Sequence, residues 1–76
     1  MTTDNRAIAR SFVLRQRPRL IHLGGEFLDV VDDRSVEVSR AQLRRELVDF
    51  LRRLGEPREA SDAVLVALQE EVSRGN

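Results

Sequence analysis

The adjacent glycines Gly24 and Gly25 separate two apolar runs in the first half of the chain, and no other feature constrains the fold as strongly. A two-residue glycine loop fits the primed turn that joins antiparallel strands, because both loop residues need a positive φ that glycine adopts freely. The pattern therefore predicts a β-hairpin with strands at residues 19–23 and 26–31.

The predicted register, in which Leu23 pairs with Glu26, divides the hairpin into two unlike faces. One face carries Ile21, Leu23, Leu28 and Val30. The other face is mixed and carries Leu20, His22, Phe27, Asp29 and Val31. A turn at residues 32–34 and a short strand at 35–38, with Val36 and Val38 directed inward, would extend the hairpin to three strands.

Helical periodicity is present on both sides of the predicted sheet. Residues 4–15 form a broad apolar stripe, and a polar residue at position 4 or 5 can cap this helix. A second and clearer stripe begins at Ser39, which with Gln42 forms a capping-box pattern: the serine takes the N–H of residue 42, and Gln42 reaches back. Gly55 is placed to end this second helix.

The last helix is predicted to begin at Pro57 or after Ser61 and to run to about Arg74. The short connection at residues 56–57 predicts that it forms an antiparallel pair with the preceding helix. The element order is then α-β-β-(β)-α-α. The predicted fold is a small α+β domain over residues 1–76, with a hairpin or three-stranded meander packed on helices.

Composition narrows the class of protein. The chain has no cysteine, so no disulfide can support its small core. No apolar run approaches the ~20 residues of a membrane span, and no signal pattern precedes the first helix, so we expect a cytoplasmic protein. The basic residues are all arginine, a bias that suggests a GC-rich bacterium or its phage.

The net charge of zero conceals four blocks of alternating sign, which nearly match the predicted elements. Residues 1–25 carry +4, 26–37 carry −4, 38–54 carry +3 and 55–76 carry −3. Opposed blocks of this kind can pair within one chain or between two chains.

The sequence shows no catalytic or metal-binding constellation. His22 is the single histidine, and with no cysteine it completes neither a catalytic triad nor a zinc site; we expect it to be a half-exposed cross-strand partner of Phe27. Asp29, Asp32 and Asp33 lack the spacing of a calcium loop and indicate a solvated turn. We therefore expect a protein that is not an enzyme and has no cofactor and no metal.

Surplus apolar residues favour an interaction module. Several apolar positions fall outside the predicted core stripes or lie on the hairpin, and such residues often mark an interface with a protein partner or a second copy. The candidate interface residues are Leu14, Phe27, Val31, Leu65 and Val66.

Nucleic-acid binding is the alternative. Arginine suits bidentate phosphate contact, and two of the charge blocks are rich in it. The candidate phosphate ligands are Arg10, Arg15, Arg17, Arg45 and Arg52. The neutral total charge and the absence of Trp and Tyr for base stacking argue against strong binding, so docking to a protein ranks first.

Residues 20–54, from Leu-Ile-His-Leu-Gly-Gly-Glu-Phe-Leu-Asp-Val to Ser-Arg-Ala-Gln-Leu-Arg-Arg-Glu-Leu-Val-Asp-Phe-Leu, resemble the region that precedes the motor in phage and plasmid primase-helicases related to the poxvirus enzyme. The resemblance rests on element order and apolar spacing, and it implies an accessory module near replication machinery without ATPase or primase activity. The order of hairpin and helix also resembles the β-hairpin docking domains of megasynthases, which implies partner recognition instead.

Overall fold

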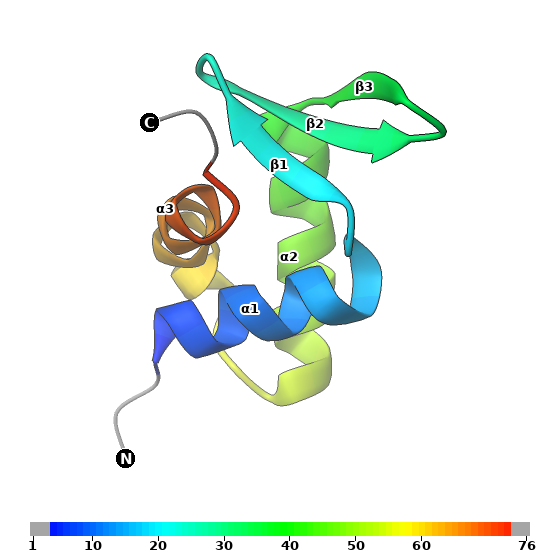
Figure 1. Ribbon diagram of the computed structural model, residues 1–76. Coiled ribbons are helices and arrows are strands. Elements are labelled where there is room, and N and C mark those ends of the chain that lie inside the picture. Colours follow the sequence, from blue (N-terminus) through cyan, green and yellow to red (C-terminus); the bar gives the residue numbers. More distant parts are fainter. Residues whose placement is uncertain (1–3, 74–76) are drawn as a thin grey trace.

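In the computed structural model, which describes residues 4–73, a three-stranded antiparallel sheet lies on one side of three helices that run in different directions (Figure 1). The predicted α+β order is confirmed, and the third strand is formed. The elements in chain order are α1 Asn5–Gln16, β1 Leu20–Leu23, β2 Glu26–Val31, β3 Arg34–Val38, α2 Arg40–Leu54, the 3₁₀ turn η1 Arg58–Ala60 and α3 Ser61–Glu71.

Both turns of the sheet have left-handed backbone. Gly24 and Gly25 have φ of 60° and 81°, and the predicted pairing of Leu23 with Glu26 is confirmed. The β2–β3 turn places Asp32 and Asp33 at φ of 50° and 66°, a conformation that aspartate tolerates better than most residues. Each turn is therefore of the primed kind, which matches the twist of the strands that it joins.

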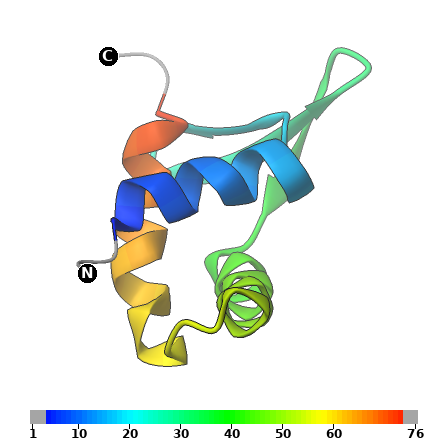
Figure 2. The same ribbon diagram turned by 90° about the horizontal axis from the view of Figure 1, so that it is seen from below.

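The sheet packs on the helices through its mixed face. The buried side chains of the sheet are Leu20, His22, Phe27 and Val38. The prediction that His22 is half-exposed is therefore wrong, because its ring packs edge-on against Phe27 at 4.9 Å between centroids. Val36 shares this face but is 54% exposed, since the end of the β2–β3 hairpin extends beyond the helices (Figure 2).

The first two helices begin and end as their sequences predict. The Asp4 carboxylate accepts the N–H of Arg6, and the Ser39 hydroxyl accepts the N–H of Gln42 at 3.1 Å. The Gln42 amide donates to Glu46 at 3.3 Å. Among the described residues no hydrogen bond joins the Ser39 N–H to Gln42, so only the serine half of the predicted capping box is formed. At the other end of α2, Gly55 adopts φ of 77° and its N–H donates to the last turn.

The connection between α2 and α3 differs from the prediction. Pro57 is extended and η1 follows it, so α3 begins at Ser61, close to the later of its two predicted starts. This extra turn redirects the chain, and Figures 1 and 2 show α2 and α3 crossing steeply, so the predicted antiparallel pair is wrong. The helix ends at Glu71, and Arg74, its predicted end, lies outside the described residues.

The core forms where the three helices and the mixed face of the sheet meet. Phe12 of α1 and Phe50 of α2 contact each other edge to face, with ring centroids 5.5 Å apart. Because α3 contacts α1, α2 and β1, it is buried over a wide arc that includes Val64, Leu65 and Leu68. Within residues 4–73, no helix combines the length and the apolar character needed to cross a bilayer.

Candidate interaction surfaces

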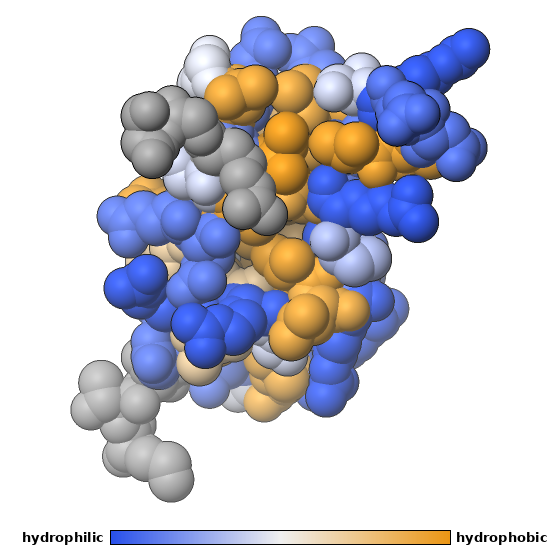
Figure 3. Space-filling view, in the orientation of Figure 1, coloured by the Kyte–Doolittle hydropathy of each residue, from blue (hydrophilic) through white to orange (hydrophobic). Residues whose placement is uncertain are grey.

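The aliphatic face of the sheet is turned away from the helices. We call Ile21, Leu23, Leu28 and Val30 the outer sheet face; the register places all four on one side, and none of them is buried. In Figure 3 apolar side chains gather over β1 and β2 and continue onto α1. Leu23 is 45% exposed, whereas Ile21, Leu28 and Val30 are partly buried.

The sheet has two unlike edges. On β1, the His22 N–H donates to the Val72 carbonyl at 2.9 Å, so the end of α3 partly covers this edge. On β3, no backbone hydrogen bond joins the outer edge to any other segment of residues 4–73. The uncovered edge thus belongs to the hairpin that extends beyond the helices.

The predicted interface residues divide into two groups. Leu14, Val31 and Val66 are 72%, 43% and 58% exposed, on α1, β2 and α3 respectively. Phe27 and Leu65 are 2% and 8% exposed and belong to the core. Their assignment to an interface is therefore wrong. Phe27 lies on the face of the sheet that packs on the helices, and Leu65 is buried because α3 is contacted by α1, α2 and β1.

Arg17 forms the most enclosed polar cluster of the described residues. Its guanidinium donates to Glu46 of α2 through Nε at 3.0 Å and Nη2 at 2.5 Å, and also to Asp29 of β2. The three side chains are 19%, 26% and 16% exposed. The hydrogen bonds from Arg17 lower the pKa of Glu46 below its ordinary value, and those to Glu46 raise the pKa of Arg17, in both cases against the opposing effect of burial.

The five predicted phosphate ligands are not equally available. Arg17 is committed to its two carboxylates, and Arg10 lies 3.4 Å from Glu71. The other three are exposed and have no hydrogen bond or ion pair to another described residue: Arg15, Arg45 and Arg52. They lie on two helices, α1 and α2.

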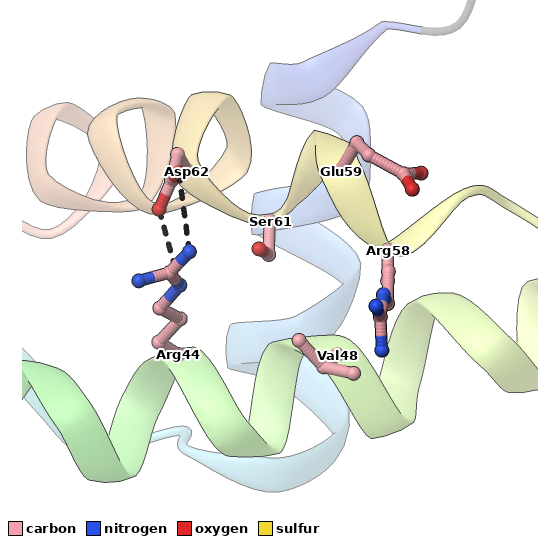
Figure 4. A pocket seen from close by; sticks show the side chains of 6 residues that line it. All are labelled: Arg44, Val48, Arg58, Glu59, Ser61 and Asp62. Carbon is pink, nitrogen blue, oxygen red and sulfur yellow. Dashed lines mark hydrogen bonds and ion pairs between the residues drawn. The ribbon is translucent and has the colours of Figure 1, made fainter.

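A pocket of about 450 Å³ lies between α2 and the start of α3 (Figure 4). Arg44 and Asp62 close one side with an ion pair of 3.2 Å, and Arg58 stands on the other side. The hydroxyl of the buried Ser61 points between them towards Val48. These residues can hold a polar group; of the two carboxylates in the lining, Asp62 is paired with Arg44.

No family model, no curated protein and no solved structure matches this chain.

Two features of these surfaces escaped the sequence analysis. The partners of Arg17 are 12 and 29 residues away, and only the alternating charge blocks hinted that a basic segment would meet acidic ones. The pocket depends on the crossing of α2 and α3, for which the sequence held no local signal.

Within residues 4–73, no group of three or more His, Cys, Asp or Glu side chains is placed to hold a metal ion.

Proposed function

We propose that this chain is a docking module that binds a second copy of itself through its three-stranded sheet. The observation that supports the proposal is an unfinished sheet. Helices cover one face, and the end of α3 partly covers β1. On the outer sheet face Leu23 is 45% exposed, and among residues 4–73 no strand pairs with the edge of β3. An open edge is a template for another strand, and isolated small sheets gain stability from further strands.

A second copy suits this surface because of its charge. The chain is neutral overall, so two copies meet without net repulsion. The outer sheet face also has charged side chains of both signs at its borders. Glu26 and Glu37 lie on β2 and β3, and Arg19 lies beside Val30 just before β1. A mixed border of this kind is compatible with an isologous contact, in which one patch meets itself.

The proposal is tested by the mass of the protein in solution. Sedimentation over an about 100-fold range of chain concentration should show a monomer that converts to a dimer. Two exposed sheet residues, Leu23 on the outer sheet face and Val36 on β3, are each replaced with lysine, and at least one replacement should weaken the dimer.

Leu54→Lys is the matched control, because Leu54 is 46% exposed, like Leu23, but lies at the end of α2. A constant monomer mass over the whole range would show that the proposal is wrong. The same conclusion holds if the control weakens the dimer as much as both sheet variants do.

A further inference from the structure

The edge of β3 gives the self-docking a specific geometry. We infer that two copies pair antiparallel through their β3 strands, about a two-fold axis at Val36, so that two three-stranded sheets become one continuous sheet. The inference rests on the self-docking proposed above and says which part of the sheet makes the contact.

The backbone groups available at this edge follow from the ladder. The Val30 N–H donates to the carbonyl of Arg19, the residue before β1, so the backbone groups of Val30 point towards β1. Because these directions alternate along an antiparallel strand, the backbone groups of Asp29 and Val31 point towards β3. Val31 and Asp29 pair with Arg34 and Val36, whose backbone groups therefore point back to β2.

Ser35 and Glu37 are then the residues whose N–H and C=O point outward. Neither has a hydrogen bond to another residue of the described range 4–73. Both are exposed. In a pair of β3 strands, these two residues must form the hydrogen-bonded positions, which limits the possible registers.

Like charges select among the remaining registers. A pair centred on Ser35 places Glu37 next to the acidic turn Asp32–Asp33 that precedes β3 of the second copy, and a pair centred on Glu37 places the two Glu37 side chains opposite each other. Centring the pair on either end of the strand leaves most of it unpaired. The register centred on Val36 places Ser35 opposite Glu37 of the second copy, so backbone groups of both residues are satisfied without opposed charges.

Opposite charges meet at the ends of this register. In this register Arg34 lies opposite Val38 of the second copy, so the turn at Asp32 and Asp33, which precedes β3, comes next to the start of α2 of the second copy, which follows β3. Arg40 is the first residue of α2, where the helix dipole adds positive charge to that of the guanidinium. The acidic turn of each copy thus reaches the positive start of α2 in the other.

The pairing also accounts for an exposed apolar residue. Val36 lies on the packed side of the sheet but is 54% exposed, because no helix reaches it. Across the two-fold axis it would contact Val36 of the second copy as a non-hydrogen-bonded pair, the closest type of cross-strand pair.

Disulfide trapping tests the register. The chain has no cysteine, so Val36→Cys introduces a single thiol. Non-hydrogen-bonded partners lie about 4.5 Å apart at Cα, within the range of a disulfide. Under mild oxidation we expect Val36→Cys to form a covalent dimer at least about tenfold faster than Ser35→Cys or the α2 control Leu54→Cys. If Ser35→Cys reacts fastest, the register centred on Val36 is wrong.

Proline at position 37 tests the edge without a thiol. The Glu37 N–H points outward, so Glu37→Pro should leave the β2–β3 ladder intact, as proline does on edge strands. The dimer would lose one donor from each copy and should dissociate about tenfold more readily or more. Circular dichroism at low concentration checks that the monomer remains folded.

The outcomes separate the inference from the proposed function. A dimer that resists Glu37→Pro, and that traps Val36→Cys no faster than Leu54→Cys, refutes pairing through β3 but leaves self-docking in place. A chain that stays monomeric refutes both. Rapid trapping at position 36 together with loss of the dimer in Glu37→Pro supports both.

Discussion

Replacing Arg17 with methionine removes the guanidinium that joins three parts of the fold while keeping most of the aliphatic stem. Arg17 follows α1, and its partners Asp29 and Glu46 lie on β2 and α2. In the variant two carboxylates remain in a poorly hydrated site without their cation. We expect it to fold but to have a much lower free energy of unfolding.

The size of the loss follows from the exposure of the three side chains. Breaking a fully buried ion pair by removing one partner costs about 3–5 kcal/mol. Here the side chains of Arg17, Asp29 and Glu46 are 19%, 16% and 26% exposed, so water screens part of the remaining charge. We therefore expect a loss of about 2–3 kcal/mol. At about 0.05–0.15 kcal/mol per residue, this is a large part of the stability of a chain of this length.

Urea denaturation followed by circular dichroism measures the loss at a fixed chain concentration. With a slope of about 1 kcal/mol per molar urea, the midpoint should fall by about 2–3 M. Arg15→Met is the control, because Arg15 is exposed and has no hydrogen bond or ion pair to another described residue. Adding Glu46→Gln to the Arg17 variant should recover about 1 kcal/mol, since one of the two stranded charges is gone. Equal midpoints for the Arg17 and Arg15 variants would refute the reasoning.

Four further outcomes are expected. Arg17 lowers the pKa of Glu46 below its ordinary value of 4.5, so the Glu46 carboxylate stabilises the fold above pH 4.5 and loses this effect as the pH falls through its folded pKa. The difference in free energy of unfolding between wild type and Glu46→Gln should therefore narrow as unfolding is measured at lower pH. Gly55→Ala should cost about 1 kcal/mol in urea, since φ is 77° at this position. Leu65→Ala should lower the free energy of unfolding by about 2–4 kcal/mol because Leu65 is buried, whereas Val66→Ala should change it by no more than about 0.5 kcal/mol because Val66 is exposed. Thermal unfolding of the two variants measures this difference. If the arginines bind phosphate, fluorescence anisotropy should show DNA affinity that falls steeply above about 50 mM salt and less steeply for Arg52→Gln, and flat or absent binding would remove the nucleic-acid alternative.

Features set by neighbouring residues were predictable from the sequence. The turn at Gly24 and Gly25, the cap at Ser39 and the helix end at Gly55 each depend on a few residues and their backbone preferences. The strand register followed because the two-residue turn fixes it.

Features set by packing were not predictable in the same way. Both faces of the hairpin carry apolar side chains, so periodicity alone could not decide that Phe27 would be buried and Leu23 exposed. Leu65 appeared surplus because a single stripe on α3 was assumed, whereas α1, α2 and β1 all contact this helix. Arg17 appeared to be a free cation because its partners are distant in the sequence.

The Arg17 cluster also bears on how the sheet is presented for docking. Only four side chains of the sheet are buried among the described residues, and the end of the β2–β3 hairpin extends beyond the helices. Arg17 binds β2 through Asp29 and α2 through Glu46, so it holds the middle of the sheet to the helix that follows β3. In the inferred pairing, the start of α2 meets the acidic turn of the second copy, which requires a fixed angle between α2 and the hairpin. An ion cluster that holds β2 to α2 would therefore also fix the relative position of the two surfaces that the inferred pairing brings together.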